Sequence, residues 1–236
     1  NDFKSLKLES PCYIISLVEL EKQLYNFKNL FPKGTIFAYS YKTNYLKPII
    51  AFLDSNSLLS EVVSPFEVDI TKEYNIDPKN IIYNGPTKDF KSIMYVLSHS
   101  GLVQIDSLQD MAMINNCLPL NCKARVGIRL NLSSFDPCLK SRFGFDIASS
   151  QFKKLLAQIE SNDNVVLESI HSHIADRSLL TFRKQFRAIE SILKDNSVLH
   201  KLKYLNIGGG FPSILDPFLK KQISIDFDEN VFTSEV

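Results

Sequence analysis

The chain lacks the features that mark several large classes of protein. Its 236 residues include 27 basic and 26 acidic side chains, and a net charge of +1 gives no sign of a nucleic acid or an anionic membrane as partner. No apolar run exceeds the length of a strand, so we expect no transmembrane span. Residues 1–10 are too polar for a secretory signal.

Cysteines and glycines are few, and their spacing excludes further kinds of site. The four cysteines show neither C-x-x-C spacing nor the density of a disulfide-rich protein, so we expect reduced thiols and a cytoplasmic protein. The eight glycines form neither a G-x-G-x-x-G pattern nor a P-loop, so neither a dinucleotide nor a nucleoside triphosphate is indicated.

What the chain does have is a regular alternation of strand-length and helix-length segments. Strands are predicted at 12–17, 35–45, 58–64, 80–86, 102–107, 123–131, 165–174 and 204–210, with 223–227 as one more. Helices are predicted at 18–30, 46–56, 67–74, 88–99, 108–116, 151–160 and 179–195. No linker or repeat divides them, so we expect one domain over residues 1–236. An α/β fold with a parallel sheet follows; a doubly wound sheet and a TIM (β/α)8 barrel both fit, and the strand count and small inward-facing residues favour the barrel.

The stretch Thr35–Tyr45 predicts a buried strand that ends in a lysine. Side chains alternate along a strand, so one face is aromatic, with Phe37, Tyr39 and Tyr41 fit to lie under helices. The other face narrows through small residues to Lys42, whose ammonium is unfavourable in a core unless it is paired, neutralised or used chemically. Such a lysine can form an imine with a carbonyl compound. The alternative is a lysine that reaches solvent from the strand end.

Polar side chains follow almost every predicted strand. In a barrel the carboxyl ends of the strands meet at one rim, where catalytic groups lie. The side chains expected at this rim are Lys42, Asn44, Glu61, Ser64, Asn84, Asp106, Ser107, Arg129, Asn131, His171, His173 and Asn206. Single polar residues at strand ends are ordinary caps and turns, so it is their joint placement that predicts a site.

The last predicted strand before residue 211 leads into the glycine run Gly208–Gly210. Consecutive glycines expose backbone N–H groups without side chains in the way, which suits a phosphate. A tight turn that needs positive φ explains the same run equally well. Both interpretations stay open at this point.

The pair His171 and His173 is compatible with a metal site or with a flat cofactor. A metal-dependent hydrolase needs further His or Asp ligands on other strands, and the other histidines, His99 and His200, fall at the ends of predicted helices. We therefore expect no bound metal. A histidine ring that stacks on a cofactor fits better, and a hydrogen-bonded core histidine is the alternative.

Short motifs in a fixed order connect the chain to a known family. They are A-Y-S-Y-K-T-N-Y, S-P-F-E, N-G-P-T-K, I-D-S, G-I-R-L-N, R-F-G-F, H-S-H-I and G-G-G-F-P. Together they resemble the barrel domain of the fold type III pyridoxal-phosphate enzymes, the group of diaminopimelate, ornithine and arginine decarboxylases, over about residues 11–212. The resemblance implies pyridoxal 5'-phosphate as cofactor, decarboxylation of a basic or diamino L-amino acid, and a homodimer.

The resemblance also implies roles for single residues. Lys42 would hold the cofactor as an internal aldimine and His173 would stack on its pyridine ring, which makes these two the expected catalytic residues. Arg129 would lie near the cofactor. The remaining residues expected to bind the cofactor or to support its pocket are Asn44, Glu67, Asp106, Ser107, Gly208, Gly209 and Gly210.

Departures from the family pattern keep other functions open. Where the family has Gly-Ser after H-x-H-I, this chain has Ala175 and Asp176, and a carboxylate repels a phosphate unless Arg177 compensates. Glu61 stands where aspartate is usual. The family's E-P-G-R segment, whose glutamate pairs with the pyridine nitrogen, and its β-domain are not found after Pro212, so we expect a barrel fragment or a degenerate member. A racemase and a non-catalytic cofactor-binding relative are the alternatives to a decarboxylase.

Overall fold

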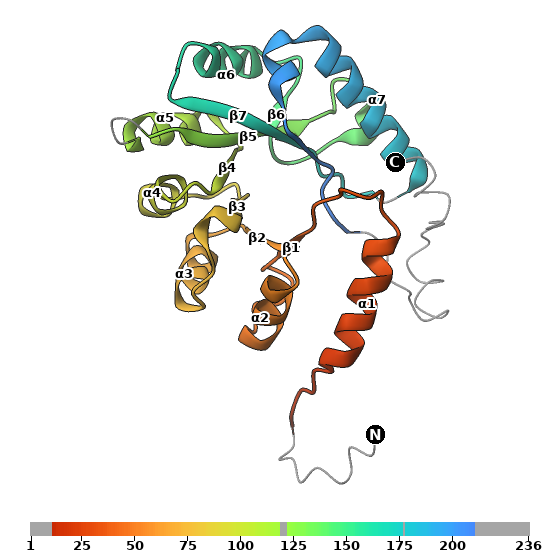
Figure 1. Ribbon diagram of the computed structural model, residues 1–236. Coiled ribbons are helices and arrows are strands. Elements are labelled where there is room, and N and C mark those ends of the chain that lie inside the picture. The colour runs from red at the N-terminus through yellow and green to blue at the C-terminus, as the bar shows by residue number, and fades with distance from the viewer. Residues whose placement is uncertain (1–10, 119–121, 177, 211–236) are drawn as a thin grey trace.

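The computed structural model describes residues 11–118, 122–176 and 178–210, which form a parallel sheet covered by helices (Figure 1). The strands are β1 (Ala38–Ser40), β2 (Leu59–Val62), β3 (Ile81–Tyr83), β4 (Leu102–Ile105), β5 (Ala124–Asn131), β6 (Phe145–Asp146), β7 (Val165–His171) and β8 (Tyr204–Asn206). The α-helices are α1 (Leu17–Asn29), α2 (Lys47–Ser55), α3 (Pro65–Glu73), α4 (Phe90–Ser98), α5 (Leu108–Cys117), α6 (Ser150–Glu160) and α7 (Leu179–Asp195). The alternation predicted from the sequence is confirmed.

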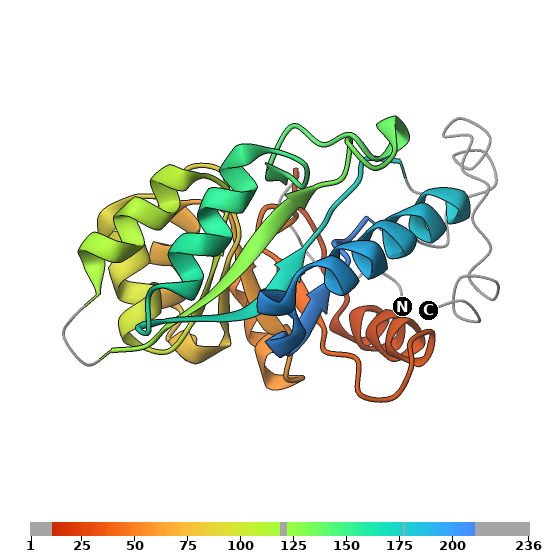
Figure 2. The same ribbon diagram turned by 90° about the horizontal axis from the view of Figure 1, so that it is seen from above.

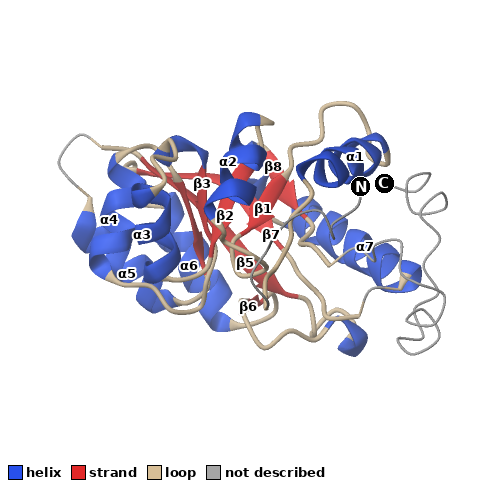
Figure 3. Cartoon of the chain, turned by 90° about the horizontal axis from the view of Figure 1, so that it is seen from below, coloured by secondary structure: helices blue, strands red, loops and turns tan. Residues whose placement is uncertain are grey.

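The strands pair in the order β1-β2-β3-β4-β5-β7-β8, all parallel, and β6 pairs with β5 outside this path. This sequential order is that of an α/β barrel, since a doubly wound sheet reverses its order at a switch point. Within the described residues β1 and β8 are the two edges and do not pair with each other, so the sheet is a half-barrel. Figure 2 shows helices α3 to α6 side by side along the sheet, and Figure 3 shows the strands between the helices.

Of the predicted strands, one is not formed and another cannot be compared with the structure. The strand expected at 12–17 is wrong, because residues 12–16 have no regular structure and α1 begins at Leu17. The hydroxyl of Ser16 accepts a hydrogen bond from Glu19 N and starts the helix at this point. The strand expected at 223–227 lies outside the described residues. Among the helices described, none is both long and apolar enough to cross a lipid bilayer.

The lysine-bearing segment has the two faces that its alternation predicts, but Lys42 is not buried. The ring of Phe37 packs edge-on against Phe27 and Phe31 of the α1 region, with centroids 5.7 and 5.5 Å away. Strand β1 ends at Ser40, and a turn follows in which Thr43 N donates to Ser40 O over 3.1 Å. Because the in-and-out alternation stops at this turn, Lys42 is exposed, and the predicted burial of its ammonium was wrong.

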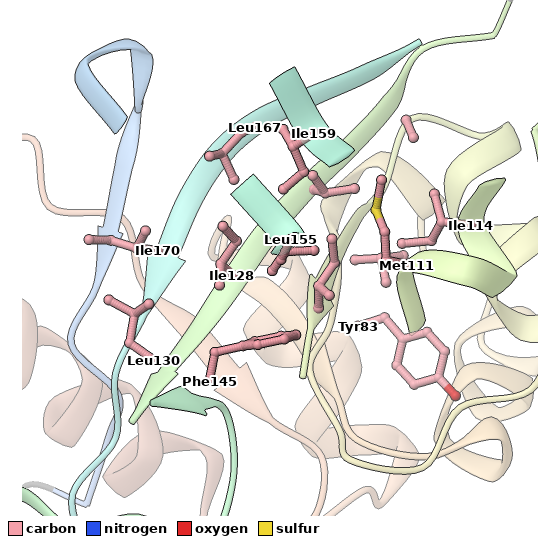
Figure 4. Close-up of a cluster of buried hydrophobic side chains, with 14 of the residues drawn as sticks. Tyr83, Met111, Ile114, Ile128, Leu130, Phe145, Leu155, Ile159, Leu167 and Ile170 are labelled. Atoms are coloured by element: carbon pink, nitrogen blue, oxygen red, sulfur yellow. The ribbon is translucent and has the colours of Figure 1, made fainter. Parts of the chain in front are cut away.

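The largest part of the core lies between the outer face of the sheet and the helices. Figure 4 shows Leu155 of α6 beside Ile128 of β5, with Phe145 of β6 below them. Helix α6 buries positions 152, 155, 156 and 159, the spacing of one helical face. Leu155 and Ile128 are fully buried, with no exposed surface. These contacts fix β5, the longest strand, beneath its helices.

We expect Leu155→Ala to lower the free energy of unfolding by about 3 kcal/mol, because it leaves a cavity under α6 that the packed core cannot close. The matched control is Leu180→Ala on α7, whose side chain is 59% exposed and whose loss changes stability by about 0.5 kcal/mol or less. Urea unfolding followed by circular dichroism measures both. An equal loss in the two variants would contradict the packing described here.

Candidate functional site

The carboxyl ends of the strands bring together a rim of polar side chains, as the sequence predicts. Glu61 of β2 accepts a hydrogen bond from Ser40 Oγ of β1 over 3.1 Å. Asn84, directly after β3, is bonded to His171 of β7, with Asn84 Nδ2 and His171 Nε2 3.2 Å apart. Since these pairs join positions far apart in the chain, the parallel sheet is what assembles the rim.

Lys42 belongs to this rim electrostatically even though its side chain is exposed. Its positive charge lowers the pKa of Glu61 and of His171, in each case together with Arg129. Burial is the larger effect on Glu61 and raises the pKa of its carboxyl above the ordinary value, while the hydrogen bond from Ser40 lowers it. The exposed Lys42 therefore acts electrostatically on the half-buried carboxyl group of Glu61.

His171 is a neutral core histidine. Its side chain is buried, and burial together with the cation of Arg129 lowers its pKa to about 3. The ring of His173 is parallel to it within 7°, with centroids 6.5 Å apart. Of the alternatives that the sequence leaves open for these two residues, hydrogen bonding within the core describes His171, while His173 lies nearer to solvent.

Arg129 and Asp106 face each other across neighbouring strands. The buried guanidinium of Arg129 places Nη1 at 3.7 Å from Asp106 Oδ2, and its Cζ lies 4.7 Å from the centroid of the Phe143 ring. Asp106 Oδ1 accepts a hydrogen bond from Gly144 N. Neither Arg129 Nε nor Asp106 Oδ2 has a hydrogen-bond partner among the described residues. Two buried polar atoms of opposite character thus lack a hydrogen bond at this point of the rim.

The glycine run after β8 packs closely on His173. Gly208 has φ +80°, and a Cβ at this residue would lie 2.5 Å from His173 Nδ1, so both backbone conformation and space require glycine. Gly208 N donates to Asn206 Oδ1 over 2.9 Å and Gly209 N to His173 Nδ1 over 3.3 Å. A Cβ at Gly209 would meet nothing within 4 Å, so the backbone there is open to a ligand. Gly210 has φ +88°.

Other predicted site residues hold turns next to the rim. Asn44 holds the turn before α2, where its Oδ1 accepts a hydrogen bond from Leu46 N. Glu67 is buried and accepts from Val63 N over 2.8 Å, and Ser107 caps α5 by accepting from Asp110 N. The structure therefore places Glu67 and Ser107 as supports of the strand ends.

Asp176, the unexpected carboxylate after the H-x-H-I motif, is bonded within its own turn. Its Oδ1 accepts from Ser178 N over 3.0 Å and its Oδ2 from Thr181 Oγ1 over 2.6 Å. The carboxylate thereby supports the start of α7, where a negative charge is favourable. Arg177, the residue expected to compensate it, lies outside the described residues.

One buried ion pair close to the rim was not predicted from the sequence. Lys88, in the connection from β3 to α4, is bonded to Asp110 in the first turn of α5, with Lys88 Nζ and Asp110 Oδ2 3.0 Å apart. Two features of the sequence could have indicated this pair: Lys88 ends the motif N-G-P-T-K, and Asp110 follows the helix cap Ser107 by three residues. Across residues 11–118, 122–176 and 178–210, no group of three or more His, Cys, Asp and Glu side chains could hold a metal ion.

Comparison with known proteins identifies relatives of this fold and sequence. A diaminopimelate decarboxylase of Aquifex aeolicus is 27% identical over 216 residues, which cover 85% of this chain and 50% of the relative. A lysine/ornithine decarboxylase of Selenomonas ruminantium is 23% identical over 214 residues, covering 87% of this chain and 52% of the relative. The chain thus spans about half the length of the curated relatives it matches.

Solved structures agree with this fold. A crystal structure of AQ1208 from Aquifex aeolicus has a TM-score of 0.72 at 25% identity and covers 88% of this chain and 50% of its own. A diaminopimelate decarboxylase of Helicobacter pylori has a TM-score of 0.75 at 19% identity, covering 99% and 61%. A family model described as pyridoxal-dependent decarboxylase, pyridoxal binding domain, matches residues 17–229. The chain belongs to the pyridoxal-dependent decarboxylase family, of which it contains the pyridoxal binding domain.

Proposed function

We propose that this chain binds pyridoxal 5'-phosphate covalently through Lys42 and contributes the cofactor site to a decarboxylase of basic or diamino L-amino acids. The observation that carries the proposal is the rim itself, in which Lys42 and Arg129 both act electrostatically on Glu61 and His171 while Lys42 remains exposed. The family membership and the names of the relatives support the cofactor and the substrate class. The homodimer implied by the resemblance is part of the same proposal.

The rim fits this cofactor in three respects. Lys42 offers a primary amine that can attach an aldehyde. Arg129 Nε is a buried N–H donor without a hydrogen-bond partner among the described residues, which suits an anionic oxygen. The side of Gly209 on which a Cβ would lie is open, while its N–H is bonded to His173, so the turn has room for a phosphate beside it.

Each residue has a separate task in the proposed reaction. When bound, the cofactor supplies an electron-withdrawing ring that stabilises the electron pair left behind as CO2 departs. Lys42 would hold the cofactor through its amine, and that amine would be released when the substrate amine takes its place. Glu61 accepts a hydrogen bond from Ser40 Oγ, and burial raises the pKa of its carboxyl above the ordinary value, so we assign proton transfer at the rim to this group. His173 offers a ring held by Gly209 N, on which a flat group can stack.

A neutral His171 is a requirement of this arrangement. A third cation beside Lys42 and Arg129 would repel both, whereas the neutral ring shares a hydrogen bond with Asn84. Burial lowers the pKa of His171, so protonation of the ring lowers the stability of the folded state. His171 thereby connects the charge of the rim to the stability of the fold.

Borohydride reduction with pyridoxal phosphate tests the attachment site. We expect peptide mass mapping to find a pyridoxyl group on Lys42, with the label lost in Lys42→Ala. The matched control is Lys47→Ala, five residues further on and also exposed, which we expect to keep the label at its wild-type level. A label that persists in Lys42→Ala, or one that Lys47→Ala removes, would contradict the proposal.

Measuring CO2 release and substrate chirality together separates the alternatives. We expect CO2 from at least one of L-lysine, L-ornithine, L-arginine and meso-diaminopimelate, with Lys42→Ala lowering the rate about a thousandfold or more. Loss of optical activity without CO2 would instead show a racemase. A labelled Lys42 with neither reaction would show a cofactor-binding protein without turnover.

We expect protonation of His171 to destabilise the fold on the acid side. The unfolded chain takes up this proton below about pH 6.5, and the folded chain only near pH 3. Stability from this group is complete above pH 6.5 and falls by about 1.4 kcal/mol for each pH unit between these two values. Urea unfolding at about pH 7 and about pH 5, compared with His171→Gln, isolates the contribution. If the free energy of unfolding changes equally between the two pH values in the wild type and in His171→Gln, then His171 is not held neutral.

A further inference from the structure

Lys88 is a fully buried charged side chain close to the rim. Its side chain has no exposed surface, and its ammonium donates to Gly85 O and to Asp110 Oδ2 and lies 5.8 Å from the centroid of the Tyr83 ring. Taking an ammonium and a carboxylate out of water is so unfavourable that apolar side chains of the same volume often give equal or greater stability. A gain in stability therefore does not explain this pair, and a role in positioning is the alternative.

Asp110 connects the pair to the backbone of the rim. The same oxygen that accepts from Lys88, Oδ2, also accepts from Asp106 N over 2.8 Å. Asp110 N in turn donates to Ser107 Oγ over 3.3 Å. The carboxylate of Asp110, held in place by Lys88, thus fixes the backbone of Asp106 where β4 leads into α5.

Asp106 passes this constraint to Arg129. Its Oδ1 accepts from Gly144 N, and its Oδ2 lies 3.7 Å from Arg129 Nη1. Gly144 has φ +85°, and a Cβ there would lie 2.7 Å from Arg129 O, so the loop approaches β5 at its closest here. The position of Asp106 therefore sets both the carboxylate that faces Arg129 and the loop that carries Phe143 beneath its guanidinium.

A similar turn shows what Lys88 adds. At the end of β2, Glu67 accepts from Val63 N over 2.8 Å and Ser64 accepts from Glu67 N, so the turn closes without a bonded lysine among the described residues. At the end of β4 the residue whose N–H is bonded to Asp110, namely Asp106, itself carries a carboxylate, where the β2 turn has Val63. Lys88 interacts favourably with both carboxylates and offsets their mutual repulsion.

We propose that the buried Lys88–Asp110 pair is a positioning device, which fixes Asp106 and through it the guanidinium of Arg129 for binding of the cofactor. The proposal rests on the function proposed above, because it assigns Arg129 to the cofactor site. Lys88 and Asp110 touch neither the cofactor nor the substrate in this account and act through Asp106 alone.

Cofactor affinity and hydrogen exchange test this together. We expect Lys88→Met to weaken pyridoxal phosphate binding, followed by absorbance, about tenfold, and to speed exchange of the Asp106 amide in the cofactor-free protein. The control is Lys203→Met, which removes a lysine bonded to Glu168 over 2.6 Å directly before β8, at the opposite end of the strands. We expect the control to leave both measurements unchanged.

Two double variants separate positioning from stability and cover the case in which Lys88→Met fails to fold. Both Lys88→Met/Asp110→Asn and Lys88→Met/Asp110→Leu remove the buried charges, but only the Asp110→Asn change keeps an acceptor for Asp106 N. We expect the variant with asparagine to retain near wild-type cofactor affinity and the variant with leucine to lose about tenfold. Equal affinity in the two would overturn the proposal.

The same experiments distinguish failure of the proposed function from failure of the positioning role. If the wild-type protein takes up no cofactor, the proposed function fails, and the Asp106 amide still decides whether Lys88 fixes this turn. Wild-type exchange in folded Lys88→Met overturns the positioning role whatever the cofactor does. Unchanged cofactor affinity with Lys42 labelled overturns the positioning role alone.

Discussion

The register between β4, β5 and β7 is the constraint on which the rim depends. It pairs Gln104 with Gly127 and Gly127 with Ser169, and Gln104 Nε2 donates to Ser169 Oγ over 3.0 Å across the glycine. A Cβ at Gly127 would lie 2.1 Å from Gln104 Oε1, so glycine makes room for this crossing side chain. One layer further towards the carboxyl ends, the same register places Arg129 beside His171. The buried layer supports the layer that carries chemistry.

The polar groups above this layer are balanced in charge. Arg129 faces Asp106, Lys88 is bonded to Asp110, and His171 between the cations is neutral. Each arrangement follows from the unfavourable burial of an unpaired charge, which demands a partner or a shift to the neutral form. Lys42 is exposed, so its charge needs no buried partner. An amine in contact with solvent is also accessible to an incoming aldehyde.

The chain spans about half of the curated relatives it matches, and its own residues already account for a defined part of the proposed chemistry. The half-barrel contains the amine of Lys42, the Arg129 guanidinium with an Nε that lacks a hydrogen-bond acceptor among the described residues, and the turn at Gly209. The choice among basic amino acids requires contacts to the far end of the substrate. The roles proposed for these residues all concern the cofactor.

The sequence by itself determined the alternation of elements, the identity of the rim residues and the family, because periodicity and ordered motifs are local properties of the chain. It did not determine that Lys42 is exposed, since that depends on where β1 ends and on the turn after Ser40. Nor could it show the Lys88–Asp110 pair, which joins a loop to a helix, or the crossing of Gln104 over Gly127 to Ser169, which joins three strands. Only the tertiary structure decides such contacts, because side-chain burial and partners depend on the register between strands that are distant in sequence.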